Sequence, residues 1–264
     1  MDSTSANSFD RVNDPFEPSL LEHDFDVVAA GRPIQLQSHQ MVFNPTRFGL
    51  NLAPLLAERI HPGMNVCEIG IGSGVLCILA GLLGATVTGL DINPQAVHMT
   101  RRNWASNDLP PEHGRFMQST VFSALPDTDA ESFDLVWSNP PLLPQLDFVD
   151  QTIRDREGYE VAGEHGRRVL DGVLGHAQKW LKPGGRAVTI ATSVQGWGDT
   201  QRLLEQSWER FEIIRELELE LTDECGPEYI QWWLDQEAND GEERVYQRDG
   251  KWLHKVWFLE AWRG

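Results

Sequence analysis

Three short motifs hold the residues best suited to chemistry, and each directly follows a segment predicted to be a strand. The first is Glu68-Ile69-Gly70-Ile71-Gly72-Ser73-Gly74, which opens a predicted helix. Glycines let the backbone turn tightly and let a ligand contact main-chain atoms, and the helix N-terminus offers free N–H groups. A dinucleotide loop would need glycine where Val75 stands, because its frame is G-x-G-x-x-G. The acid before the first glycine instead suits a ligand without a pyrophosphate at this point.

The second motif is Asp91 at the end of the next predicted strand, 21 residues after Gly70. A carboxylate at this place can accept hydrogen bonds from both ribose hydroxyls of an adenosyl ligand. The alternative is that Asp91 caps the following helix. Asn93 suits that role better, since Pro94 would then occupy the first helical position.

The third motif is Ser138-Asn139-Pro140-Pro141-Leu142, after another predicted strand. Ligands of open α/β sheets bind outside the carboxyl ends of the strands. The two prolines remove N–H donors and stiffen the chain, which leaves carbonyl groups and the Asn139 amide oxygen as acceptors. Such acceptors can bind the N–H groups of a substrate nitrogen and aim its lone pair at a methyl group. The alternative is that these residues form an ordinary turn. The strand before them is predicted to lie beside the strand that leads into the glycine loop, and this position favours a role in substrate binding.

Strand and helix patterns alternate around these motifs, which predicts an α/β fold with a mostly parallel sheet and helices on both faces. Before this region, residues 25–43 alternate around Gly31-Arg32-Pro33 and indicate a hairpin. The seven strands expected in the sheet are residues 65–70, 86–92, 115–120, 133–138, 186–192, 211–221 and 255–262. The expected helices are residues 46–60, 74–84, 94–107, 167–181 and 199–208.

Two segments follow the third motif whose roles the sequence leaves open. An insertion at about residues 222–253 holds five aromatic residues among many acids, so it either covers a ligand, docks a partner or forms a local packing cluster. A predicted substrate loop carries acids of which at least one can pair with a cationic substrate, while the others are expected to be solvated. These acids are Asp147, Asp150, Asp155, Glu157 and Glu160.

The charge and the cysteine content limit the classes of substrate and partner that the protein is expected to bind. The chain has 22 basic and 40 acidic residues and a net charge of −18, whereas nucleic-acid binders usually carry a basic face. We therefore expect no nucleic acid as substrate, and a cationic or neutral small molecule or a basic protein segment instead; solubility alone also explains such a charge. The three cysteines show no zinc spacing, so no metal is expected. No apolar run is long enough for a membrane span and no secretory signal is visible, so a cytoplasmic protein is expected.

Together the motifs resemble class I S-adenosylmethionine-dependent methyltransferases, specifically the Asn-Pro-Pro group that includes the glutamine methyltransferases of peptide release factors. The resemblance covers about residues 41–193. Besides the three motifs it rests on Val42-Phe43-Asn44-Pro45, Asn93-Pro94, Asn103, Asn107, Ala162-Gly163-Glu164-His165-Gly166 and Leu181-Lys182-Pro183-Gly184-Gly185.

The resemblance implies a Rossmann-like methyltransferase domain over residues 44–264, preceded by a tail and hairpin over residues 1–43. The implied cofactor is S-adenosylmethionine, whose methionine part would lie in the glycine loop and whose ribose would bind Asp91. The implied cofactor residues are Glu68, Gly70, Gly72, Gly74, Asp91, Ile92, Thr120 and Asn139. Asn139 and Pro140 would be catalytic, and Phe43, Asn139, Pro141 and Leu142 would bind the substrate.

Three departures from the family concern the substrate more than the cofactor. Leu142 stands where relatives usually have an aromatic residue, and Thr120 where they often have an aspartate near adenine. Phe48-Gly49 replaces an acid-threonine pair common in relatives without a large N-terminal domain.

Four functions follow as hypotheses. The first is an N-methyltransferase for a polar small molecule such as an amino acid or guanidino compound, favoured by the acidic charge, Leu142 and the insertion. The second is a protein glutamine methyltransferase, for which a partner subunit or a homodimer would help to recognise the substrate. The third, a catalytically inactive binding subunit, is disfavoured by the complete motifs, and the fourth, an NAD-dependent oxidoreductase, by the glycine frame.

Overall fold

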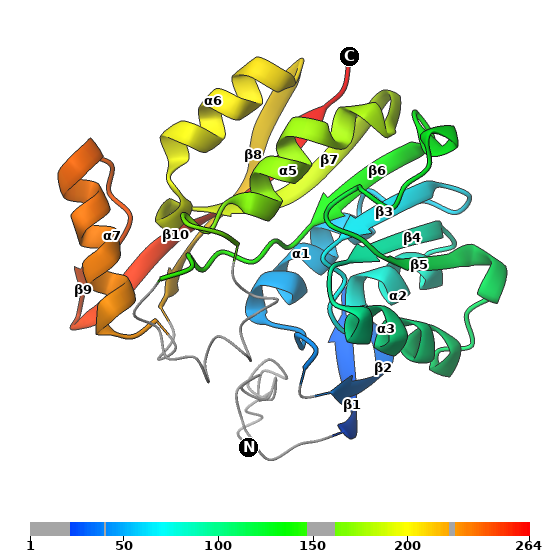
Figure 1. Cartoon of the computed structure of the whole chain (residues 1–264). Coiled ribbons are helices and arrows are strands. Elements are labelled where there is room, and N and C mark those ends of the chain that lie inside the picture. The colour runs from blue at the N-terminus through cyan, green and yellow to red at the C-terminus, as the bar shows by residue number, and fades with distance from the viewer. Residues whose placement is uncertain (1–21, 40, 147–161, 222–224) are drawn as a thin grey trace, which may run out of the picture.

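The computed structural model describes residues 22–39, 41–146, 162–221 and 225–264, and Figure 1 shows their arrangement. An eight-stranded sheet has the order β5-β4-β3-β6-β7-β10-β8, and β9 pairs with β10. Strands β5, β4, β3, β6 and β7 are parallel, whereas β10 is antiparallel to β7, β8 and β9. The expected mostly parallel α/β sheet is therefore confirmed. The strands are β3 (Asn65–Ile69), β4 (Thr86–Asp91), β5 (Gly114–Gln118), β6 (Phe133–Ser138), β7 (Leu181–Thr192), β8 (Arg210–Glu220), β9 (Tyr246–Arg248) and β10 (Lys251–Trp262).

Helices cover both faces of the sheet, with α1, α2 and α3 on one face and α5 and α6 on the other (Figure 1). Strand side chains alternate between two apolar clusters, as a period of two requires. Leu135 and Trp137 of β6 pack with α1 and α2, whereas Val136 packs with α5. The helices are α1 (Arg47–Ala57), α2 (Val75–Leu82), α3 (Pro94–Ser106), α5 (Arg168–His176), α6 (Trp197–Ser207) and α7 (Pro227–Asp240), and short 3-10 turns span Pro111–His113, Asp127–Asp129, Ala177–Lys179 and Ser193–Gln195.

The expected N-terminal hairpin is present as β1 (Glu22–Ala29) and β2 (Arg32–His39), a separate two-stranded sheet. Two asparagines one turn apart on α3 attach it to the core. Asn103 exchanges hydrogen bonds with the backbone of Gln37 at 2.7 and 3.0 Å, and Asn107 does the same with Gln35 at 3.0 and 2.7 Å. Because a side-chain amide offers a donor and an acceptor, these two residues make the backbone hydrogen bonds to β2 that a neighbouring strand would otherwise make.

The insertion forms α7 and β9, and its aromatic side chains pack on the segment that follows Asn139-Pro140-Pro141. Tyr229 and Trp233, one turn apart on α7, are buried with Leu143 and Leu146. The packing-cluster alternative is therefore realised for these residues, and a cover over a ligand or a docking site for a partner stays a prediction. Strand β10 begins at Lys251, slightly before the expected end of the insertion. In the described parts of the chain, no helix is long and apolar enough to cross a membrane.

Candidate active site

The glycine loop between β3 and α2 needs glycine for two physical reasons. Gly70, Gly72 and Gly74 have φ angles of +79°, +50° and +87°, which side-chain-bearing residues rarely adopt. A Cβ atom on Gly72 would also lie 2.8 Å from the Phe43 carbonyl oxygen, and one on Gly74 would lie 2.6 Å from a Thr100 methyl carbon. The loop is thus closed tightly against the chain before α1 and against α3.

Asp91 supports this loop from the neighbouring strand. Its carboxylate accepts hydrogen bonds from the backbone N–H of Gly72 at 3.0 Å and of Asn93 at 2.8 Å. Burial raises the pKa of Asp91, and the backbone N–H groups partly oppose this effect. Asn93 caps α3 by accepting from Gln95 N–H at 2.9 Å, with Pro94 at the first helical position. The capping prediction is confirmed, and spare acceptor capacity remains on the Asp91 carboxylate.

Glu68 lies on β3 below the loop and is 2% exposed. Its carboxyl accepts a hydrogen bond from the thiol of Cys77 at 2.9 Å. Burial raises the pKa of Glu68 to about 8, while the hydrogen bond from Cys77 acts in the opposite direction. Burial thus favours the protonated form of this carboxyl, and a ligand cation nearby would favour its ionised form. Cys67 and Cys77 are buried and not disulfide-bonded, as expected.

The chain between the hairpin and α1 supplies two further polar groups that sequence reasoning missed. The Phe43 carbonyl accepts from Ser73 N–H at 3.1 Å, which holds this segment on the glycine loop. Next to it, Asn44 Oδ1 and Thr46 Oγ1 are buried without a hydrogen-bond partner. Unpaired buried polar atoms are costly, so such atoms indicate a ligand. Two carboxylates and two unpaired oxygens fit an adenosyl cofactor that brings an ammonium group and ribose hydroxyls.

Asn139 follows β6 and lies between the glycine loop and α1. A Cβ atom on Gly70 would be 4.0 Å from the Asn139 carbonyl oxygen, and one on Gly49 would be 3.7 Å from its Nδ2. The end of β6 is fixed because Ser138 Oγ donates to the Ile69 carbonyl at 2.8 Å. Pro140 is buried and Pro141 half-buried. The structure thus brings the third motif against the first, and Gly49 leaves the space beside Asn139 free of a side chain.

The other expected site residues lie around this centre. Phe43 is 37% and Ile92 45% exposed. Thr120 is exposed and lines a hollow of about 510 Å³ against α5, and the backbone N–H of Ser119 before it donates to the Asp91 carbonyl at 2.7 Å. Leu142 is half-buried against the α7 cluster instead. The acids Asp147, Asp150, Asp155, Glu157 and Glu160 lie outside the described residues.

His254 on β10 is a buried histidine that the sequence analysis did not single out. It is 2% exposed, its Nδ1 has no hydrogen-bond partner, and its ring lies 6.0 Å from that of Phe48. Burial lowers the pKa of His254 to about 4, so the imidazole is neutral. Among the described residues, no cluster of three or more histidine, cysteine or acidic side chains can hold a metal ion.

Many acids of residues 209–243 already have partners within the protein. Ion pairs join Glu218 to Arg248, Glu220 to Lys251 at 2.6 Å, and Asp240 to Arg244 at 2.6 Å. The Glu242 carboxylate accepts from the backbone N–H of Gly198 at 2.9 Å. These carboxylates are therefore paired within the protein and are less available to a cationic substrate.

A family model described as a methyltransferase domain matches residues 60–238. A protein of Methanocaldococcus jannaschii, whose name proposes protein N5-glutamine methylation, is 28% identical over 188 residues, which are 70% of this chain and 90% of that protein. The ribosomal protein L11 methyltransferase of Laribacter hongkongensis is 40% identical over 125 residues, which are 45% of this chain and 36% of that protein.

Solved structures show the same fold at low identity. The Thermus thermophilus 16S rRNA N2 G1207 methyltransferase, in complex with AdoMet and guanosine, has a TM-score of 0.60 and 18% identity, over 92% of this chain and 51% of that chain. The E. cuniculi Mtq2–Trm112 complex, which methylates the termination factor eRF1, has a TM-score of 0.54 and 16% identity, over 85% of this chain and 99% of that chain.

Proposed function

The chain belongs to the methyltransferase domain family, and from that premise we propose that it methylates the side-chain amide nitrogen of a glutamine in a protein. It is a methyltransferase that uses S-adenosylmethionine, and the acceptor is the part we infer. The observation that carries the inference is Asn139-Pro140, which lies directly against the glycine loop. The name of the M. jannaschii relative proposes the same acceptor, and the structurally similar Mtq2–Trm112 complex also methylates a protein.

The bound cofactor supplies the electrophilic methyl group, so the protein mainly provides binding, orientation and electrostatics. Asp91 would accept from the ribose hydroxyls. Ionised Glu68, together with Asn44 and Thr46, would receive the ammonium group. The closely packed glycine loop lets the ligand reach main-chain atoms, since it carries no side chains at three positions.

An amide nitrogen is a poor nucleophile because its lone pair is delocalised. The Asn139 amide oxygen and the Pro140 carbonyl would accept hydrogen bonds from its two N–H groups and localise that pair. They would also hold the nitrogen in line with the methyl group, and such positioning can contribute roughly 7–11 kcal/mol toward the barrier. As the nitrogen–methyl bond forms, the methyl–sulfur bond breaks, S-adenosylhomocysteine leaves, and one N–H proton is released to solvent. Pro140 and Pro141 keep this turn stiff and offer no competing N–H.

Two further points follow as proposals. Residues 44–264 would be the catalytic domain and residues 1–43 an appended tail and hairpin, because β2 is held to the core by the side chains of Asn103 and Asn107. A partner subunit would help to present the protein substrate; the structurally similar Mtq2 was solved in complex with a second protein, Trm112. A small polar amine or guanidine, the first hypothesis from the sequence, becomes the second candidate acceptor, and the net charge of −18 favours it.

The test is methyl transfer from labelled S-adenosylmethionine to a matched panel. It contains a glutamine-containing release-factor peptide, the same peptide with glutamate in place of glutamine, and free glutamine, arginine and lysine. We expect label only in the glutamine peptide. Label in free arginine or lysine, with none in the peptide, would replace the proposal by the small-molecule alternative.

A further inference from the structure

The segment that follows Pro141 is held in position by contacts with the insertion. Leu143 and Leu146, 9% and 5% exposed, are buried against Tyr229 and Trp233 of α7. On its other side the segment pairs with residues 162–163, since Ala162 N–H donates to the Leu143 carbonyl at 3.0 Å and Gln145 N–H to the Gly163 carbonyl at 2.8 Å. The path of the chain leaving Asn139 therefore depends on α7.

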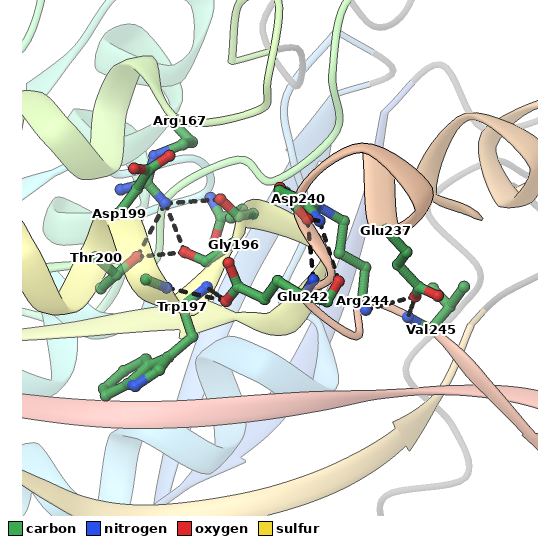
Figure 2. Close-up of polar contacts among 12 residues, drawn as sticks. Arg167, Gly196, Trp197, Asp199, Thr200, Glu237, Asp240, Glu242, Arg244 and Val245 are labelled. Atoms are coloured by element: carbon green, nitrogen blue, oxygen red, sulfur yellow. Dashed lines mark hydrogen bonds and ion pairs between the residues drawn. The ribbon is translucent and has the colours of Figure 1, made fainter. Parts of the chain in front are cut away.

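The carboxylate of Glu242, in the insertion, binds the N-terminus of α6 in the core domain. Glu242 accepts hydrogen bonds from the backbone N–H groups of Trp197 and Gly198 in the first turn of α6 (Figure 2). These N–H groups have no partner within the helix, and the positive end of the helix dipole favours an anion there. Glu242 thus attaches the C-terminal side of α7 to α6.

Arg244 completes this attachment. Its guanidinium binds both Asp240 carboxylate oxygens at 2.8 and 2.6 Å, a bidentate pair that closes the end of α7. Glu237 accepts from the backbone N–H of Arg244 at 2.5 Å and of Val245 at 2.8 Å (Figure 2). Ser193 Oγ donates to the Arg244 carbonyl at 2.6 Å. The turn after α7 is therefore rigidly held between α7 and the end of β7.

The same start of α6 is connected back to the third motif through Arg167. This buried guanidinium donates to the carbonyls of Gln195 and Gly196 at 2.7 and 2.9 Å (Figure 2). Gln195 Nε2 donates to the Gly166 carbonyl at 2.7 Å. A Cβ atom on Gly166 would lie 2.1 Å from the Leu142 carbonyl oxygen. A continuous set of contacts therefore runs from the insertion to the residue directly after Asn139-Pro140-Pro141.

We propose that residues 226–246 are the element that positions the methyl acceptor, and that Glu242 is a positioning residue for the transfer. This inference rests on the proposed role of Asn139-Pro140 in holding the acceptor nitrogen. The cofactor residues Glu68 and Asp91 end strands β3 and β4, on the other side of β6 from this element. Loss of the Glu242 contact should therefore change acceptor binding and leave cofactor binding nearly as it is.

The experiment compares Glu242→Gln and Glu242→Ala with Glu243→Gln. The neighbouring Glu243 is exposed, and its Oε2 lies 3.6 Å from Nζ of Lys255 on β10, so it is a matched control. Three quantities are measured: the affinity for S-adenosylhomocysteine by calorimetry, the KM and kcat for the glutamine peptide, and hydrogen exchange by mass spectrometry. Thermal melts verify that each variant is folded, and Glu242→Gln keeps the side-chain shape if the alanine variant is too unstable.

We expect the KM for the peptide to rise about fivefold to tenfold in Glu242→Ala, the size of a lost helix cap, and less in Glu242→Gln. The dissociation constant of S-adenosylhomocysteine should change less than about twofold in both variants. Amides in peptides covering residues 140–146 and 162–166 should exchange faster, and those of the glycine loop should not. Glu243→Gln should match the wild type in all three measurements.

Unchanged exchange over residues 140–146 in both Glu242 variants would overturn the inference. So would an equal loss of cofactor and acceptor affinity, because that pattern indicates general loosening of the fold. If the wild-type protein methylates no glutamine peptide, the proposed function fails, and the exchange data still decide whether Glu242 holds the segment after Asn139.

Discussion

Asp91 and Gly72 are joined by a hydrogen bond of 3.0 Å from the loop N–H to the carboxylate, across two neighbouring strands. Asp91 therefore has a structural task in the glycine loop in addition to its proposed contact with the ribose.

Asp91→Ala should lose most of the stabilisation that S-adenosylhomocysteine gives to the protein. For the wild type, a ligand at 100 times its dissociation constant adds about 2.7 kcal/mol to the free energy of unfolding. The variant loses the acceptor for the ribose hydroxyls and the support of Gly72, so its melting temperature should also fall without ligand. Gly72 and Asn93 bind different oxygens of Asp91, so Asp91→Asn keeps an acceptor for one of them and should lose less stability than Asp91→Ala. A full ligand-induced shift in Asp91→Ala would remove this residue from the cofactor site.

Glu68 should make cofactor binding depend on pH. Burial raises the pKa of Glu68 from 4.5 to about 8, so the folded protein holds a proton there that the unfolded chain loses. Its contribution to stability is complete below pH 4.5 and is lost as the pH rises through 8. An ammonium group beside Glu68 requires the ionised form, so affinity for S-adenosylhomocysteine should increase from pH 6 to pH 8 with release of protons. Calorimetry in buffers of different ionisation enthalpy measures that release, which Glu68→Gln should abolish; equal proton release by both proteins would contradict the assignment.

His254 should contribute to unfolding at low pH. Its pKa falls from 6.5 to about 4 on burial, so the unfolded chain binds a proton that the folded protein excludes. The stability linked to this group is complete above pH 6.5 and is lost as the pH falls to about 4, by at most on the order of 3 kcal/mol. Urea unfolding of wild type and His254→Phe between pH 7 and pH 4 should show a smaller decrease in the variant. The exposed His61, changed to Gln, serves as control, and parallel curves for His254→Phe and wild type would refute the prediction.

The sequence predicted that the three motifs lie together because each follows its own strand. Glu68 lies near the end of β3, Asp91 ends β4 and Asn139 follows β6, and these strands are neighbours in the sheet. Carboxyl ends of parallel strands lie on one edge, so the chain order of the motifs sufficed to bring them together. The choice of Asn93 over Asp91 as helix cap followed from local rules alone and is confirmed.

The groups that the sequence did not reveal depend on distant contacts. Tyr229 and Trp233 alone give α7 its fully buried stripe, which is too short a pattern for a helix prediction amid so many acids. The role of Glu242 depends on α6, 44 residues away in the chain. The unpaired atoms of Asn44, Thr46 and His254 are defined by what surrounds them after folding. Composition cannot distinguish such acids and histidines from those that are solvated.

Asn139→Ala should separate turnover from cofactor binding. The Asn139 amide is proposed to accept from the substrate nitrogen, and loss of one well-placed hydrogen-bonding group in a preorganised site costs on the order of 100-fold or more in rate. Cofactor affinity should stay close to that of the wild type, because the loop glycines, Glu68 and Asp91 remain. Calorimetry with S-adenosylhomocysteine and single-turnover methyl transfer measure the two quantities.

Gly49→Ala is the control for crowding beside Asn139. The added methyl group would lie 3.7 Å from Asn139 Nδ2, an ordinary van der Waals contact, so this variant should keep its turnover if the amide itself carries the effect. A turnover near wild type in Asn139→Ala would reject the nitrogen-orienting role and make an oxygen or carbon acceptor the better hypothesis. A large loss in both variants would instead assign the effect to the shape of the pocket between α1 and β6.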